Sequence, residues 1–144
     1  MAVSAAVPGG AGYSGTPLAK KLGVVAASRV CAIDAPFDYR AVVAPWPAGA
    51  SLQKEVDRTT DIAHLFVRER ARLEREAGRL RRAMRDDAVL WVSWPKKTAR
   101  VATDISEDAV RAVALPLGWV DVKVCAVDAT WSGLELVVRR ELRA

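Results

Sequence analysis

Residues 61–94 constrain the fold more than any other part of the chain, because they place a clear helix between two apolar strands. DIAHLFV (residues 61–67) and AVLWVSW (residues 88–94) have the composition of buried strands. Between them, residues 69–84 carry apolar side chains at helical spacing, and these form one stripe: Leu73, Ala77, Leu80 and Met84. A strand, a helix and a second strand in this order predict a right-handed crossover between parallel strands.

The segments before this unit predict further elements. RVCAID (residues 29–34) is typical of a buried strand, the following proline breaks it, and residues 37–43 favour a short helix. In YSGTPLAKKLG, Thr16 would cap a short helix, Pro17 would lie in its first turn and Gly23 would close it. Residues 52–56 favour a weak strand, and residues 1–12 are small and nearly uncharged, as expected of a flexible tail.

The segments after it predict a second helix and a hairpin. Ser106 or Asp104 would cap the helix, which ends near residues 116–118. At residues 120–126, apolar side chains alternate with Asp121 and Lys123, which predicts a strand with one apolar face. A last strand is predicted at residues 134–140. The whole pattern predicts an α/β protein, with a three-layer, Rossmann-like, mainly parallel sheet and an antiparallel C-terminal hairpin, in one domain over residues 13–144.

Composition excludes several kinds of site. The 144-residue chain has a net charge of +5, a mild bias toward anionic partners. Its single histidine, His64, and two separated cysteines, Cys31 and Cys125, exclude a zinc site of the usual Cys/His kind, and we expect reduced, buried thiols. No apolar run approaches the ~20 residues that cross a bilayer, and the N-terminus lacks a secretion signal. We therefore expect a cytoplasmic protein without membrane contact.

The candidate ligand-binding residues follow two predicted strands, because ligands of open α/β sheets bind beyond the carboxyl ends of the strands. Asp34 ends the first strand, and Trp94, Lys96 and Lys97 end AVLWVSW and its WPKK elbow. The lysines would hold a phosphate or carboxylate, or they would lie in a solvated loop. At most one of them would face a cleft, because adjacent residues in an extended segment point opposite ways. Asp34 would contact a ligand or cap the turn that follows it.

The turn after the first strand argues against a nucleotide cofactor. Dinucleotide and adenosylmethionine sites need glycines there, because glycine lets the backbone approach the ligand. AIDAPFDYR offers a proline and two aromatic residues instead, and no glycine. These bulky groups would occupy the space of the cofactor, so we predict no cofactor.

Other motifs have a structural and a functional interpretation. SGTP is a helix start rather than a phosphate loop, since it lacks the GK[ST] ending. His64 shares a strand face with Ile62 and Phe66, which favours a packed, hydrogen-bonded histidine. Glutamates alternate with the arginines of residues 69–84, which favours ion pairs on a solvated face over nucleic-acid binding. Trp131 would fold over the sheet edge or belong to a partner surface.

Several motifs in order, YSGTPLAKKLG, DIAHLFV, LWVSWPKK and the segment from VATDIS to RRELR, closely resemble a bacterial family of unknown function, over residues 13–143. That resemblance implies no activity. More distantly, the second half resembles the closing half of class I methyltransferases, where alternating strands and helices also end in an antiparallel hairpin. The first half departs from them, since the Gly-rich motif is absent and only Glu55 or Asp57 would replace the ribose-binding acid.

The sequence thus favours a non-catalytic, degenerate Rossmann-like domain that binds a protein partner or a small anionic ligand. The alternative is a methyltransferase-related enzyme that acts on a small molecule, with Asp34 as the acid or base. The edge strand of the hairpin would also suit a homodimer surface.

Overall fold

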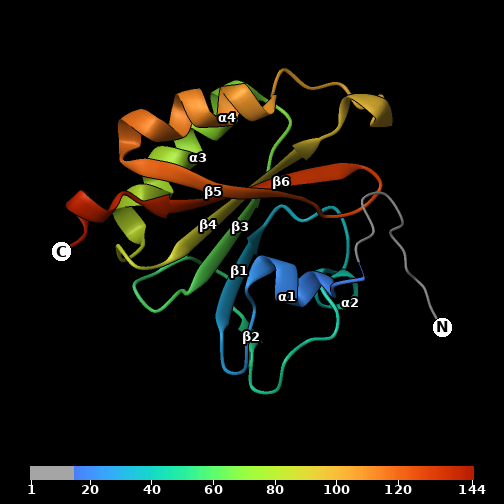
Figure 1. The fold of residues 1–144 in the computed structure, drawn as a ribbon, viewed down its shortest axis with the longest axis vertical. Helices are drawn as coiled ribbons and strands as arrows, with labels where there is room; N and C mark the ends of the chain where they lie inside the picture. Colours follow the sequence, from blue (N-terminus) through green and yellow to red (C-terminus); the bar gives the residue numbers. More distant parts are fainter. Residues whose placement is uncertain (1–14) are drawn as a thin grey trace.

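A computed structural model describes residues 15–144, so the predicted tail at residues 1–12 lies outside the described residues. One six-stranded sheet has the order β2-β1-β3-β4-β6-β5 (Figure 1). Its strands are β1 (Arg29–Ile33), β2 (Ser51–Leu52), β3 (Ile62–Phe66), β4 (Val89–Pro95), β5 (Trp119–Ala126) and β6 (Trp131–Val138). The helices are α1 (Leu18–Leu22), α2 (Tyr39–Val42), α3 (Arg70–Ala83) and α4 (Glu107–Ala114), with 3₁₀ turns η1 (Lys97–Ala99), η2 (Leu115–Leu117) and η3 (Arg140–Leu142).

The sheet is parallel in its first part and antiparallel in its last. β1 pairs in parallel with β2 and β3, and β3 pairs in parallel with β4. β6 is antiparallel to both β4 and β5. The predicted α/β class, the parallel strands and the antiparallel closing hairpin are therefore confirmed.

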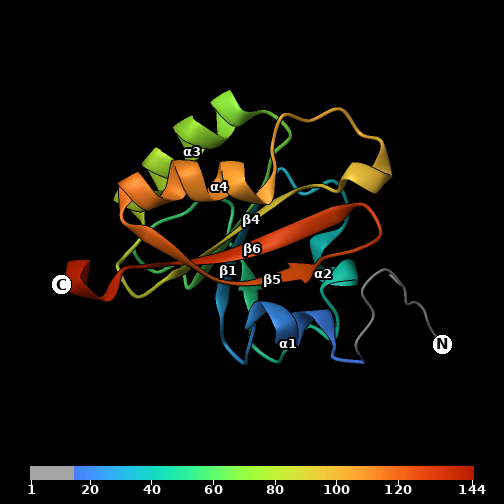
Figure 2. The ribbon, with the colours of Figure 1, turned by 45° about the horizontal axis from the view of Figure 1, so that its top comes forward.

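The two faces of the sheet carry unequal cover. α3 and α4 lie on one side, and α1 and α2 lie on the other (Figures 1 and 2). α3 has 14 residues, whereas α1 and α2 have five and four. The predicted three-layer Rossmann-like arrangement stays a prediction, because the second face is covered largely by short helices and loops.

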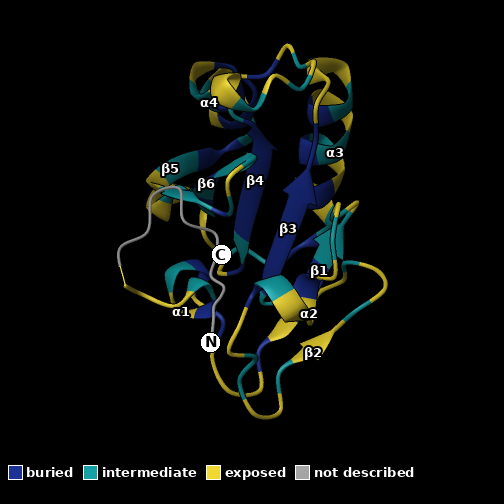
Figure 3. Cartoon of the chain, turned by 90° about the vertical axis from the view of Figure 1, so that its right-hand side faces the viewer, coloured by how far each residue is buried: buried dark blue, intermediate teal, exposed yellow. Residues whose placement is uncertain are grey.

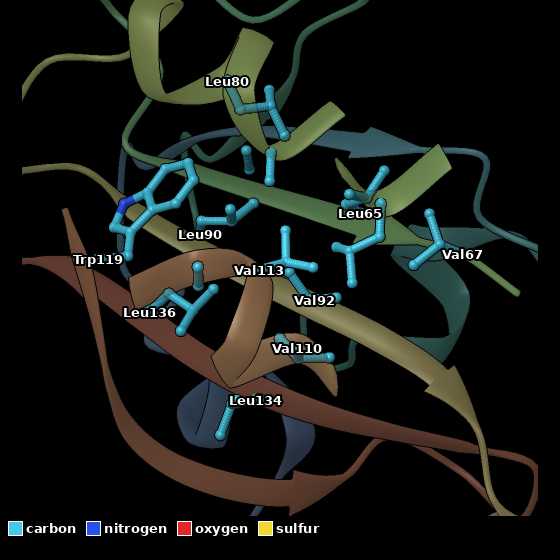
Figure 4. Close-up of a cluster of buried hydrophobic side chains, with 14 of the residues drawn as sticks. Leu65, Val67, Leu80, Leu90, Val92, Val110, Val113, Trp119, Leu134 and Leu136 are labelled. Carbon is cyan, nitrogen blue, oxygen red and sulfur yellow. The ribbon is translucent and has the colours of Figure 1, made fainter. Parts of the chain in front are cut away.

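The larger hydrophobic core lies under α3 and α4. The predicted stripe is confirmed: Leu73, Ala77 and Leu80 are buried, as is Met84 directly after the helix. Figure 4 shows Leu80 with side chains of β3, β4, β6 and α4 in this core. Fully burying a leucine stabilises a fold by roughly 1.5–3 kcal/mol, so this stripe fixes α3 on the sheet.

The outer face of α3 carries the ion pairs that its sequence predicts. Arg70 pairs with Glu74, and Arg79 donates to the Glu76 carboxylate at 2.7 Å. Such exposed pairs contribute little stability each, about 0–1 kcal/mol. Their value is that they neutralise arginines that would otherwise repel one another.

Two helix starts differ from expectation in detail. The Ser106 hydroxyl accepts from the Ala109 N–H at 3.1 Å, so Ser106 is the cap of α4. Asp104 instead accepts from the Arg70 N–H at 2.7 Å and so links this loop to the start of α3. In α1 the N-cap position is Pro17 rather than the predicted Thr16, and Gly23 closes the helix with φ +82° as expected.

Two strands have other bounds than predicted. β2 has only two residues, Ser51 and Leu52. The Gln53 N–H still donates to the Val30 carbonyl at 2.7 Å, and the Gln53 side chain bonds Thr59 and Thr60 of the next turn. β6 begins at Trp131 rather than at residue 134, because Asp128 turns the chain early by accepting from the Trp131 N–H at 2.7 Å.

The predicted apolar face of β5 is wrong, because a β-bulge interrupts the strand. Asp121 pairs with Leu136 and Lys123 pairs with Glu135, which leaves Val122 as the extra residue. Side chains after the bulge therefore point to the opposite side from the one that simple alternation gives. Val122 and Val124 are 54% and 46% exposed.

Among the described residues, no helix has both the length and the apolar character to cross a bilayer. The cytoplasmic location stays a prediction.

The packing around Gly133 generates the first testable prediction. A Cβ atom there would lie 3.2 Å from the Trp91 ring, 3.3 Å from the Ser93 oxygen and 3.3 Å from Val127. Because Trp91 and Ser93 are fully buried and cannot retreat, we expect Gly133→Ala to lower the free energy of unfolding by about 1–3 kcal/mol, measured by urea denaturation. Gly78→Ala is the matched control in α3, where the new methyl group meets only the end of Arg82 at 3.6 Å and should add about 0.5–1 kcal/mol. Equal effects of the two changes would contradict the packing argument.

Candidate functional site

Asp34 lies directly after β1, at the carboxyl-end edge where the sequence placed it. Its backbone has φ +57°, the left-handed conformation that glycine favours and that aspartate tolerates. Its carboxylate forms an ion pair with Arg72 of α3. The side chain is thus half exposed and engaged with the helix on the α3 side of the sheet.

The corner that follows Asp34 is closed by packed side chains. Ala35 and Phe37 pack against the smaller hydrophobic core, and the rings of Phe37 and Phe66 meet edge to face with centroids 5.4 Å apart. Asp38 caps α2 by accepting from the Ala41 N–H. The corner therefore combines a left-handed turn with a filled interior.

Trp94 belongs to the larger core and is 6% exposed. Its side chain shares the α3 and α4 side of the sheet with Leu90 and Val92. An indole at this depth offers a ligand almost no surface, so a role for Trp94 would be to fix the elbow that follows it.

Lys96 and Lys97 lie where β4 ends and η1 begins. The Lys96 N–H donates to the Thr130 carbonyl at 2.8 Å, which fastens the WPKK elbow to the turn between β5 and β6. Lys96 is half-buried and Lys97 is exposed. The structure thus holds the elbow to the hairpin and Asp34 to α3, so these predicted site residues are anchored to different elements.

His64 is a packed, hydrogen-bonded residue, as predicted. It is fully buried in β3, with its Nδ1 2.7 Å from the Tyr39 hydroxyl and its Nε2 2.7 Å from the Ser93 hydroxyl. Burial lowers the pKa of His64 to about 3 and raises that of Tyr39. Figure 3 shows that β3 is buried along its length, and all three polar residues lie inside the core.

The two thiols are free, as expected. Cys31 is buried, whereas Cys125 is only half-buried because it lies in the edge strand β5. Burial raises the pKa of both thiols. Within residues 15–144, no group of three or more His, Cys, Asp or Glu side chains is placed to hold a metal ion.

Two pockets lie away from the predicted edge. One encloses about 370 Å³ at the amino-terminal ends of the strands, where Arg85 is paired with Asp61 and Asp87. The other encloses about 590 Å³ between α1 and β5, and the residues that line it are Thr16, Lys20, Lys21, Lys123, Val124, Cys125 and Ala126. The sequence predicted neither pocket. The adjacent Lys20 and Lys21 are a signal for the second, but basic residues are also what the last turn of a helix favours.

The ion pairs divide the basic residues into two groups. In the part of the chain that the structure describes, every ion pair has an arginine as its cation. Arginine suits this role because its planar fork matches a carboxylate. The six lysines of the chain take part in none of these pairs.

Comparisons with known proteins find likeness at the level of fold. No protein-family model and no curated protein matches the chain, so the bacterial family of unknown function stays a prediction. The solved structure of LaPhzM matches with a TM-score of 0.52 and 14% identity, over 77% of this chain and 50% of LaPhzM. Two structures of the antibiotic-resistance methyltransferase Kmr match with TM-scores of 0.47 at 14% and 19% identity, over 91% of this chain and 96–97% of Kmr.

The chain shares its fold with LaPhzM. It spans half the length of LaPhzM, and at 14% identity the likeness concerns the fold alone.

The resemblance to class I methyltransferases would imply adenosylmethionine as a cofactor, and the corner after β1 lacks the glycines that such a site needs. The left-handed backbone of Asp34 keeps the turn that a glycine would make. The next side chains, Ala35 and Phe37, are partly buried against the smaller core, and Phe37 contacts Phe66.

The conformation of Asp34 generates the second prediction. Both Asp34→Gly and Asp34→Ala remove the ion pair with Arg72, but only glycine adopts φ +57° without strain. We expect the glycine variant to be more stable than the alanine variant by about 1 kcal/mol in urea denaturation. Equal stabilities would mean that the turn relaxes.

The burial of His64 generates the third prediction. Its pKa is about 3 in the folded protein and near 6.5 when exposed, so the unfolded chain binds the extra proton between these values. The contribution of the neutral His64 to the free energy of unfolding is fully present above pH 6.5. As the pH drops from 6.5 toward 3, the free energy of unfolding should fall by about 1.4 kcal/mol per pH unit.

The measurement is urea denaturation between pH 7 and 4.5, above the range in which most carboxylates titrate. His64→Gln is the control, since it retains polar atoms and does not titrate. A wild-type slope equal to that of the variant would contradict the assignment.

Proposed function

We propose that this chain is a non-catalytic ligand-binding domain with a methyltransferase-like fold, and that its ligand is a small anion. The observation that carries the proposal is the division between arginines, which form the ion pairs, and lysines, which take part in none of them. Lysine ammonium groups that serve no ion pair favour an external anion. The filled corner at residues 34–37 supports a role other than methyl transfer.

Within this proposal, Lys96 and Lys97 are candidate ligand contacts at the carboxyl-end edge. Their elbow is held rigidly by Pro95 and by the bond from the Lys96 N–H to the Thr130 carbonyl. Asp34 is a weaker candidate, because Arg72 already occupies its carboxylate. Trp94 would act only by supporting the elbow from the core.

The second candidate function is a methyltransferase-related enzyme that acts on a small molecule. The fold likeness favours it, as does the left-handed turn that Asp34 keeps after β1. In this alternative Asp34 would be the acid or base and would have to release Arg72 first. A third possible function is binding to a protein partner without a small ligand, and the experiment below distinguishes it from the other two.

Thermal denaturation with added ligands separates these functions and is the fourth prediction. We expect phosphorylated metabolites or nucleotides at 100 times their Kd to stabilise the protein by about 2.7 kcal/mol, which raises Tm by about 5 °C or more. We expect adenosylmethionine to cause no shift.

Lys96→Gln/Lys97→Gln tests the elbow, with Lys54→Gln as a control for the loss of a surface charge. An unchanged shift in the double variant would remove the elbow from the site. If adenosylmethionine raises Tm and the Asp34→Asn variant shows a smaller rise, the methyltransferase-related enzyme is favoured. No shift with any compound would contradict small-ligand binding and favour a protein partner.

A further inference from the structure

The pocket between α1 and β5, which we call the α1–β5 groove, has features of a ligand site that the sequence did not indicate. Its volume of about 590 Å³ lies within the range of small-molecule sites, roughly 300–1,000 Å³. Its walls come from two elements about one hundred residues apart in the chain, the helix α1 and the edge strand β5. The groove exists only in the folded protein, so its composition is not a local sequence effect.

Three ammonium groups line the groove from both walls. Lys20 and Lys21 come from the last turn of α1, and Lys123 comes from β5. Burial raises the pKa of the Cys125 thiol, and the positive charges of Lys21 and Lys123 lower it by a smaller amount. The two charges therefore reach the same part of the groove from opposite walls.

The β-bulge at Val122 is what brings Lys123 to this side of the sheet. Asp121 faces α4, where its carboxylate accepts from Arg111 at 3.0 Å. In a regular strand Lys123 would share that face, because residues two apart point the same way. The extra residue re-aims it, so that Lys123 lies opposite Glu135 on the α1 side.

The positive charge of the groove is only partly compensated. Glu135 is the acidic neighbour of Lys123 across the hairpin, and burial raises its pKa while Lys123 lowers it. None of the three lysines takes part in an ion pair among the described residues. Like charges that face one hollow repel one another, and a ligand with several negative charges would relieve that repulsion.

Part of the groove wall is apolar. Cys125 lines it from β5, half-buried and packed against the smaller core. Its side chain points the same way as that of Lys123, two residues before it, whereas Val124 pairs with Leu134 and points to the α4 side. A purely inorganic anion would leave the Cys125 surface in water. A molecule that joins an apolar group to phosphate would cover this surface and meet the ammonium groups at once.

We propose that the α1–β5 groove binds an organic phosphate, with its phosphate held by Lys20, Lys21 and Lys123 and its apolar part against Cys125. The inference rests on the proposed anion-binding function and moves its site from the WPKK elbow to the groove.

The test is isothermal titration of the full chain with two probes, 1-naphthyl phosphate and inorganic tripolyphosphate. Lys20→Gln/Lys21→Gln and Lys123→Gln remove charge from the groove and keep most of the side-chain stem. Arg75→Gln/Arg82→Gln and Lys54→Gln are the matched controls, with the same losses of two charges and one charge at exposed positions elsewhere. Lys96→Gln/Lys97→Gln tests the elbow as the competing site. Circular dichroism and Tm establish first that each variant is folded.

We expect both probes to bind the wild type and each groove variant to bind them about tenfold more weakly or worse, with the controls changed by less than threefold. Cys125→Ser should weaken naphthyl phosphate by about threefold or more and leave tripolyphosphate unchanged. This pattern would assign the site, because net charge alone cannot produce it.

Other outcomes overturn the groove and separate it from the broader function. Loss of binding in the Lys96/Lys97 variant alone would place the ligand at the elbow and leave anion binding intact. Equal losses per charge in all variants would mean general electrostatic attraction. Tighter binding of a single-stranded oligonucleotide than of either probe would indicate a macromolecular partner. If the wild type binds neither probe, the groove proposal fails. The proposed anion binding fails as well only if the phosphorylated metabolites and nucleotides also give no shift in Tm.

Discussion

The buried chain of polar groups from Tyr39 through His64 to Ser93 is the interaction on which the rest of the arrangement depends. Two polar side chains in the apolar centre of a sheet cost stability unless they bond one another. A slip of β3 by one residue would turn His64 to the other face and break both bonds. The chain therefore fixes the register of β3 against β4, and through Tyr39 it also fixes α2 over the sheet. Because α2 directly follows the corner at residues 34–37, the same bonds hold that corner against the ends of the strands.

The hairpin shows a comparable link between strand geometry and charge. A bulge and a lysine on an edge strand are two of the means by which proteins prevent edge-to-edge pairing, and β5 has both at Val122 and Lys123. These features weaken the case for a homodimer formed by continuing the sheet through β5, although Val122 and Val124 are exposed there. They serve the proposed ligand site instead, since the bulge turns Lys123 toward α1.

The sequence predicted well where a local pattern decides the structure. The β3–α3–β4 unit follows from periodicity alone, and His64 could be placed in the core because its strand neighbours are apolar. Residues 120–126 show the limit, because nothing in the alternation of valines reveals that Val122 is an extra residue; the pairing of Asp121 and Lys123 with β6 decides it. The groove was beyond reach for the same reason. Lys20, Lys21 and Lys123 are unremarkable separately, and only the position of α1 beside the last strands brings them together. Asp34 was placed correctly at the strand end, but its partner Arg72 lies in a helix whose rotation no pattern near Asp34 specifies.

These features suggest how a sheet of this topology can support a site away from the corner after β1. Phe37 stabilises that corner by burial against Phe66. The opposite end of the sheet is less constrained, because β5 has a neighbour on one side only and tolerates the bulge. There the arginines Arg111 and Arg139 bind local acids and carbonyls and hold α4 and the hairpin, while the lysines stay outside the ion pairs. A flexible ammonium group can follow an anion without disturbing the fold, whereas a bidentate arginine cannot leave its partner at so low a cost. In the proposed site, the two basic residue types therefore have separate tasks: arginines stabilise this end of the sheet, and lysines meet the anion.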